Sequence, residues 1–283
     1  MSVPPSDPLI PDTVVAGRIS VIVPTKDSAR TLAACLASVR AQTHPDVELV
    51  VVDNSSTDAT PEIARSVADR FLTFGPERSA QRNHGAANST GELLLFVDSD
   101  LSLESGVCED AATAAAANPS WGSLIVPELA HGEGFLARCR GLEKRLYLDN
   151  PSVEGSRVYR REAFFEVGGF DERLTGYEDW DLGDRVAHSG WDTGRTIARA
   201  WHDEGRIRLP HAFAKKRYYG RWFDRYVSES GGPHRPVRRS GLLARRRLLV
   251  ESPVLTTGLV LLKTVEWTGM AVGAFEGRRR PPP

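Results

Sequence analysis

The stretch Leu93-Leu-Leu-Phe-Val-Asp-Ser-Asp100 places five apolar residues directly before two carboxylates. An uninterrupted apolar run of this length predicts a strand buried on both faces of a sheet, with its carboxyl end at a polar crevice. In an open α/β sheet, ligands bind at that edge. Residues i and i+2 of an extended chain point to the same side, so Asp98 and Asp100 can converge on one cation or one polar ligand. Such carboxylates bind Mg2+ together with substrate phosphates, whereas a solvated turn is the alternative interpretation.

Strand and helix patterns alternate around this central strand. Strands are expected at 19–24, 47–52 and 121–126, and helices near 28–39, 60–70, 135–147 and 178–189. Strands joined in this way form right-handed βαβ units. The expected fold class is therefore α/β, with a mixed, mostly parallel sheet flanked by helices and a helical C-terminal extension.

Length and composition fit one large folded domain with an appendage. The chain has 283 residues, of which 41% are hydrophobic and 26% are charged, as expected for a folded soluble protein. Residues 1–17 are rich in proline and polar groups and predict a flexible leader. Residues 18–205 carry the strand and helix pattern of a catalytic domain, and residues 206–283 predict a basic helical extension.

The cysteines and the N-terminal residues indicate a reducing compartment. Cys35, Cys108 and Cys139 are odd in number and form no C-x-x-C pair, which argues against a disulfide framework and against a cysteine zinc site. The first residues lack the basic and apolar regions of a secretory signal. We therefore expect the protein in the cytoplasm.

Charge is divided unevenly along the chain. Residues 205–283 contain 17 Lys and Arg against 5 Asp and Glu, whereas residues 1–204 contain 19 basic and 32 acidic residues. A basic C-terminal part predicts an anionic partner, such as a membrane surface, a pyrophosphate-bearing substrate or nucleic acid. The apolar stretch 253–275 is long enough to span a bilayer, but Lys263 and Glu266 near its middle argue against spanning. Two interpretations remain: an interfacial helix on the inner face of the membrane, or a helical subdomain packed on the sheet.

Acids at strand ends stand where a glycine-rich phosphate loop would be expected. The chain has no G-x-G-x-x-G motif after the first strand and no G-x-x-x-x-G-K-[ST] motif, which argues against dinucleotide-binding and P-loop sites. Asp53, at the end of the second strand, can accept hydrogen bonds from a nucleoside base or ribose, or can cap the turn that follows. Arg82, in a short helical segment before the central strand, can hold a pyrophosphate or can be an exposed helix charge.

An acidic turn with a tryptophan begins the helix expected from residue 178. Glu178, Asp179 and Asp181 lie in its first turn, where acids also interact favourably with the helix macrodipole. Trp180 offers a platform for a sugar ring beside a carboxylate that can take a hydroxyl proton. His202 follows another short strand and is either a metal ligand or a structural histidine.

Five motifs, taken in order, resemble those of family 2 glycosyltransferases of the GT-A fold. They cover roughly residues 18–205. The motifs are Val23-Pro24-Thr25, the turn Val50–Asp58, Arg82-Asn83-His84-Gly85, Val97-Asp98-Ser99-Asp100, and Gly168–Glu172 leading into Glu178–Leu182.

The resemblance implies a nucleotide-diphosphate-sugar donor, a Mg2+ or Mn2+ ion and inversion at the anomeric carbon. It also implies a role for each matching residue. The implied roles are nucleoside binding by Pro24, Thr25 and Asp53, a ribose or metal contact by Asp98, metal binding by Asp100 and His202, and proton abstraction by Asp179.

The chemistry of the residues suits that reaction. Departure of a nucleoside diphosphate builds negative charge, which a divalent ion on Asp100 offsets. A base on the opposite face of the sugar must deprotonate the acceptor hydroxyl, and of Glu178 and Asp179 we expect Asp179 to be that base.

The predicted enzyme moves a sugar from a UDP-, GDP- or dTDP-sugar to a glycan or lipid-linked acceptor, in cell-surface polysaccharide or glycoconjugate biosynthesis. No nucleic acid partner is expected. The alternatives are a sugar nucleotidyltransferase and a catalytically silent scaffold subunit with the same fold. Metal-dependent binding of nucleoside diphosphates distinguishes the enzyme from the scaffold.

Overall fold

The computed structural model describes residues 14–151, 153–223 and 245–279. The strands are β1 (Val15–Thr25), β2 (Val47–Asp53), β3 (Arg70–Thr73), β4 (Gly91–Phe96), β5 (Leu101–Leu103), β6 (Trp121–Ile125), β7 (Glu128–Glu133), β8 (Ser156–Arg160), β9 (Asp192–Arg195) and β10 (Ala200–Arg206). The helices are α1 (Leu32–Arg40), α2 (Thr60–Val67), α3 (Arg78–Ala87), α4 (Val107–Ala117), α5 (Gly134–Tyr147), α6 (Arg161–Glu166), α7 (Glu178–His188), α8 (Leu209–Gly220), α11 (Arg246–Glu251) and α12 (Pro253–Arg279).

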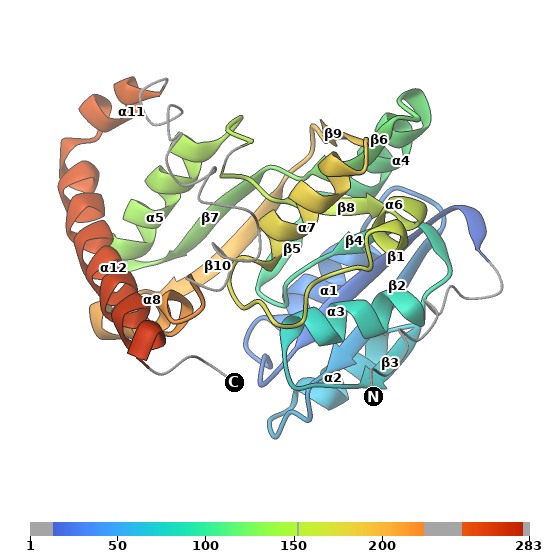
Figure 1. Cartoon of the computed structure of the whole chain (residues 1–283), viewed down its shortest axis with the longest axis horizontal. Helices are drawn as coiled ribbons and strands as arrows, with labels where there is room; N and C mark the ends of the chain where they lie inside the picture. Colours follow the sequence, from blue (N-terminus) through green and yellow to red (C-terminus); the bar gives the residue numbers. More distant parts are fainter. Residues whose placement is uncertain (1–13, 152, 224–244, 280–283) are drawn as a thin grey trace.

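The main sheet is mixed and mostly parallel, which confirms the predicted fold class. Its seven strands follow the order β3-β2-β1-β4-β8-β6-β9 (Figure 1). β1 pairs in parallel with β2 and β4, whereas β8 runs antiparallel between β4 and β6. A second sheet contains β5, β10 and β7. This small sheet joins the segment after β4 to the C-terminal part of the catalytic domain.

The central strands are buried on both faces, which is why their apolar residues follow one another without polar alternation. In β1, Ile19, Val21 and Val23 pack in a cluster with α1, α2 and α4. Ile22 of β1 faces the other way, into a cluster with Phe96 and with α3, α6 and α7. The sheet is therefore covered by helices on both sides, as in other doubly wound folds.

Several boundaries differ from the sequence prediction. α2 ends at Val67 and not near residue 70, where β3 begins. β1 begins at Val15, inside the predicted leader 1–17, because the Val15 amide donates to the Thr90 carbonyl at 2.8 Å. Residues 1–13 of that leader lie outside the described residues. His202 lies within β10 and not after a strand, because β10 continues to Arg206 between β5 and β7.

The described part of the C-terminal extension packs on the catalytic domain. α12 lies along one edge of the molecule, against α5 and α8 (Figure 1). Lys263 and Glu266 face α5, where the Lys263 amine contacts Glu143 at 2.8 Å and Glu266 pairs with Arg140. Within 14–151, 153–223 and 245–279, no helix is both long and apolar enough to cross a membrane. The basic residues at 225, 235, 238 and 239 lie outside the described residues.

Candidate active site

The carboxyl ends of β1, β2 and β4 meet at one edge of the main sheet. The register pairs Pro24 with Val52 and Thr25 with Asp53. The Val97 amide donates to the Ile22 carbonyl at 3.0 Å, so Asp98 follows at the same edge. Parallel order thus brings together residues that the sequence separates by more than seventy positions.

At this edge, Asp53 and Thr25 differ in what they contact. The Asp53 carboxylate accepts from the Ser56 amide at 2.8 Å and from the Ser56 hydroxyl at 2.5 Å. It therefore caps the turn after β2, which was the alternative weighed from the sequence, and its contact with a nucleoside stays a prediction. The buried Thr25 hydroxyl has no hydrogen-bond partner among the described residues. It is a polar group at the sheet edge that a ligand can satisfy.

Arg82 is the central cation of the site. Its guanidinium contacts Asp98 at 2.6 Å, Asp179 at 3.1 Å and Glu178 at 3.5 Å, and only 1% of its side chain is exposed. Burial lowers the pKa of Arg82, but the three carboxylates outweigh that effect and raise it. In the structure Arg82 thus holds acids and is not an exposed helix charge. Its contact with a pyrophosphate stays a prediction.

The neighbours of Arg82 explain why α3 can present it. Asn83 donates to the Phe170 carbonyl at 2.9 Å and accepts from the Phe170 amide at 2.9 Å, so it ties α3 to the loop before α7. A Cβ atom on Gly85 would lie 2.5 Å from Ile22 Cγ2, so glycine lets α3 approach the sheet closely. The Arg82-Asn83-His84-Gly85 motif therefore positions one guanidinium between the sheet edge and α7.

Asp98 lies between two arginines. Besides Arg82, Arg157 of β8 contacts its carboxylate at 3.3 Å. Burial raises the pKa of Asp98, but the two guanidinium groups outweigh burial and hold that pKa well below its usual range. Asp98 is therefore ionised and orders the arginines in the structure, while its contact with ribose or metal stays a prediction.

Asp100 and His202 come together across the small sheet. His202 Nε2 lies 3.0 Å from Asp100 Oδ2, and His202 Nδ1 lies 3.3 Å from Glu128 Oε1 and 3.6 Å from Glu204. Burial lowers the pKa of His202, but hydrogen bonds to Asp100 and Glu128 outweigh it and raise the pKa to about 10. The two predicted metal ligands are thus neighbours, with carboxylates behind the imidazole.

The Asp100 and His202 side chains fit a divalent ion. Carboxylate oxygen and neutral imidazole nitrogen both bind Mn2+, so an ion there would replace the proton on His202 Nε2. A carboxylate on the second ring nitrogen fixes the tautomer of a ligating histidine. Among the described residues, no group of three or more His, Cys, Asp or Glu forms a ready-made metal site. Two protein ligands leave positions for phosphate oxygens and water, which is how Mg2+ is usually bound.

Of the acid pair at the start of α7, only Asp179 is accessible. Glu178 is 3% exposed and contacts Arg78 at 3.1 Å as well as Arg82, whereas 40% of the Asp179 side chain is exposed. Desolvation raises the pKa of Asp179, and although Arg82 lowers it, the Glu178 carboxylate raises it further. A raised pKa suits a proton acceptor that works near neutral pH. Gly176, with φ +89°, makes the turn that presents both acids.

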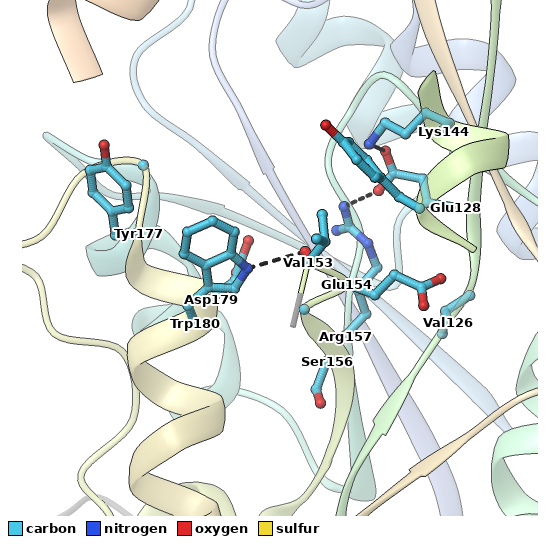
Figure 2. Close-up of a pocket in the computed structure, with 13 residues that line it drawn as sticks. Val126, Glu128, Lys144, Val153, Glu154, Ser156, Arg157, Tyr177, Asp179 and Trp180 are labelled. Carbon is cyan, nitrogen blue, oxygen red and sulfur yellow. Dashed lines mark hydrogen bonds and ion pairs between the residues drawn. The ribbon is translucent and has the colours of Figure 1, made fainter. Parts of the chain in front are cut away.

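Two cavities meet at Asp179. The first has a volume of about 240 Å³, and its lining includes Trp180, Tyr177 and Arg157. Figure 2 shows Trp180 and Asp179 on one side of this cavity and Glu128, Lys144 and Arg157 on the other. The Trp180 indole donates to the Val153 carbonyl at 3.2 Å, which orients the ring. Trp180 is therefore placed where the predicted acceptor platform would be needed, and that role stays a prediction.

The second cavity is larger and basic. It has a volume of about 470 Å³ and includes Asp179 and His202 in its lining. The basic side chains that line it without an ion-pair partner among the described residues are Arg206, Arg208, Lys215 and Lys216. These cations form a wall beside the Asp100–His202 pair, which favours a ligand that carries phosphate.

Sequence reasoning did not assign Arg157, Glu128 or the basic wall to the site. Arg157 lies in β8, whose antiparallel insertion between β4 and β6 has no local sequence signal. Glu128 begins β7 and reaches the site only because β7 pairs with β10. The positive charge of residues 205–283 was the one available signal for the wall.

Comparisons with known proteins agree with this architecture. The family model "Glycosyl transferase family 2" matches residues 20–170, more than half of the chain. A PGL/p-HBAD biosynthesis glycosyltransferase of Mycobacterium tuberculosis is 30% identical over 186 residues, which cover 61% of this chain and 70% of that protein. The glycosyltransferase GlyA of Streptococcus pneumoniae is 38% identical over 102 residues, 34% of this chain but only 15% of that protein.

Solved structures share the fold over almost the whole chain. The mannosyltransferase PcManGT from Pyrobaculum calidifontis, in complex with GDP-Man and Mn2+, has a TM-score of 0.64 at 19% identity and covers 94% of this chain and 88% of its own. Residues 1–349 of TarS from S. aureus, in complex with UDP-GlcNAc, have a TM-score of 0.54 at 19% identity and cover 93% of this chain and 92% of their own. The likeness to these structures shows that the chain has the GT-A fold, and the family match shows that it belongs to glycosyl transferase family 2, a family of transferases.

Proposed function

We propose that the protein is an inverting glycosyltransferase that moves a sugar from a nucleotide-diphosphate sugar to an acceptor hydroxyl. The observation that carries the proposal is the accessible Asp179 carboxylate, which the buried Arg82 holds between two cavities. The solved relatives PcManGT and TarS bind GDP-Man and UDP-GlcNAc, respectively. We therefore assign a UDP-, GDP- or dTDP-sugar as the donor class.

The residues have separate tasks in this reaction. Asp100 and His202 would hold a Mg2+ or Mn2+ ion, which supplies a Lewis acid for the charge on the departing diphosphate. The basic wall formed by Arg206, Arg208, Lys215 and Lys216 adds positive charge beside that position. Thr25, whose hydroxyl has no partner within the described part of the chain, offers that hydroxyl at the sheet edge, where the nucleoside would lie.

Inversion requires a single displacement with a base on the face opposite the leaving group. Asp179 takes the proton of the acceptor hydroxyl as the oxygen bonds to the anomeric carbon and the bond to the diphosphate breaks. Glu178 cannot replace it, because it is buried against Arg78 and Arg82. Trp180 would support the acceptor sugar in the first cavity.

We place the enzyme in the cytoplasm, at the inner face of the cell membrane, acting on a glycan or a lipid-linked acceptor. The family match argues against the sugar nucleotidyltransferase. A silent scaffold is the remaining alternative, because the fold alone does not require activity.

The test is a titration of UDP, GDP and dTDP with and without Mn2+, followed by mass analysis of products from the matching donors. Tight, Mn2+-dependent binding and a product one glycosyl unit heavier support the proposal. If the protein binds none of these nucleoside diphosphates, the proposal is wrong and the catalytically silent scaffold is the better interpretation. NMR of the new anomeric centre distinguishes inversion from retention.

A further inference from the structure

α12 presents a continuous uncharged face away from the rest of the molecule. It lies along the outer edge, beyond α5 and α8 (Figure 1). Its exposed positions recur every three or four residues, as on one side of a helix. From residue 253 to residue 275 they are Pro253, Val254, Thr257, Val260, Leu261, Thr264, Trp267, Thr268, Ala271 and Phe275. These ten residues, which we call the outer face, contain no charged side chain.

The charges in this stretch point inward. Lys263 is 18% exposed and Glu266 is 3% exposed, and both pair with α5 through Glu143 and Arg140. The pair that argued against membrane contact in the sequence therefore lies on the protein side of the helix. It does not charge the outer face.

The outer face is also rich in large apolar side chains. Val254, Val260, Leu261, Trp267 and Phe275 are each 51–70% exposed. Single exposed apolar residues are common on proteins, but a continuous apolar surface such as the outer face marks an interaction surface. At 1.5 Å per residue the outer face is roughly 33 Å long.

Basic residues border the outer face. Arg278 and Arg279 are exposed at the C-terminal end of α12, and the Arg279 guanidinium lies 4.3 Å from the centre of the Phe275 ring. At the other end, the charges of the exposed Arg247 and Glu251 offset each other, so the positive charge lies at the C-terminal end. An uncharged face with aromatic side chains and arginines at its border is typical of helices that lie in a membrane interface.

A second copy of the chain fits this surface less well. In a parallel pair, Arg278 and Arg279 of both copies would meet. In an antiparallel pair they would meet the end that carries Arg247 and Glu251, whose charges cancel. Neither arrangement gives a net electrostatic attraction between the two copies, whereas anionic lipid attracts the arginines.

We propose that the outer face of α12 binds the surface of an anionic lipid bilayer, with the helix axis parallel to that surface. Trp267, Phe275 and the aliphatic side chains enter the interfacial layer, and Arg278 and Arg279 contact lipid phosphates. α5 and α8, which pack on α12, contribute side chains to the second cavity. This inference deepens the membrane placement in the proposed function and rests on it for the delivery of that cavity to a lipid-linked acceptor, whereas vesicle binding is measured without any transfer activity.

The test is co-sedimentation of the full chain with vesicles of phosphatidylcholine and phosphatidylglycerol in equal parts. We expect the chain to bind these vesicles at low salt and to bind vesicles of pure phosphatidylcholine more weakly. Binding to the mixed vesicles should also weaken at about 1 M salt, because the Debye length there is only about 3 Å and the charges are screened. The double variant Trp267→Gln/Phe275→Gln should lower the partition coefficient by roughly tenfold or more, because binding scales with buried apolar area. Arg278→Gln/Arg279→Gln should weaken binding to the mixed vesicles only.

Ile197→Gln is the matched control. Ile197 is 86% exposed and lies between β9 and β10, away from α12. Its substitution also replaces an exposed apolar side chain with glutamine and leaves the charge unchanged. It should bind vesicles as the unmodified chain does, and circular dichroism should show all variants folded. A full chain that stays in the supernatant at low salt overturns the proposal, as does an aromatic double variant that binds undiminished. If sedimentation velocity without lipid shows a dimer that the double variant dissolves, a second copy covers the face and the proposal is wrong.

Discussion

Replacing Arg82 with Gln tests whether one buried guanidinium holds the acidic site together. The change removes contacts to Asp98, Asp179 and Glu178 at 2.6, 3.1 and 3.5 Å. Removing one partner of a buried ion pair costs about 3–5 kcal/mol, because the remaining charge is left uncompensated. Arg157 still contacts Asp98 after the change. We therefore expect the lower end of that range, a loss of about 3 kcal/mol in the free energy of unfolding.

Urea unfolding at pH 7, followed by circular dichroism, measures this loss. The control is Arg30→Gln, which removes a 2.6 Å ion pair with Asp203 from a side chain that is 62% exposed. Exposed pairs contribute at most about 1 kcal/mol. If Arg82→Gln costs no more than Arg30→Gln, the guanidinium does not hold the acids and our account of the site is wrong. Transfer activity of the folded variant should fall as well, because Asp179 loses the group that positions it.

Three further predictions concern the site and the extension. Asp179→Asn should leave nucleoside diphosphate binding intact in calorimetry while transfer falls by roughly 10²–10⁴, and a collapse of binding instead would make Asp179 a binding residue. Asp100→Ala and His202→Ala should each abolish the Mn2+ dependence of nucleoside diphosphate binding. If either variant still binds nucleoside diphosphates in a Mn2+-dependent way, the substituted residue is not a metal ligand. Burial raises the pKa of Glu143, but Arg140 and Lys263 outweigh burial and lower that pKa to about 2. The ionised Glu143 therefore contributes to the free energy of unfolding above pH about 4.5, and this contribution is lost as the pH falls through about 2. Glu143→Gln should thus reduce the acid sensitivity of the unfolding free energy over that range, on the order of 3 kcal/mol, and an unchanged pH profile would contradict the assignment.

The local sequence was sufficient for β1, β2, β4 and β6 and for the edge where the site lies, but not for β3, β5, β7 and β8. A strand buried on both faces needs an apolar run, and Leu93–Val97 is one. Carboxyl ends of parallel strands meet at one edge, so Asp53 and Asp98 could be placed there before any contact was known. The acids of α7 and the motif order pointed to the same family that the family model matches.

The partners of these residues were decided only by tertiary packing. Arg82 contacts acids 16, 96 and 97 positions away, and His202 meets Asp100 across 102 positions. No local pattern encodes such contacts, because they depend on the antiparallel β8, on the pairing of β10 with β5 and on the docking of α7.

The C-terminal helix shows the same division between sequence and structure. From the sequence, Lys263 and Glu266 could only be counted as charges within an apolar stretch. Packing against α5 decides that both face the protein, since a buried charge is stable only beside a partner of opposite sign. The sequence by itself therefore determined that an apolar helix with basic borders would form, and the tertiary structure decided which of its faces is free of charge.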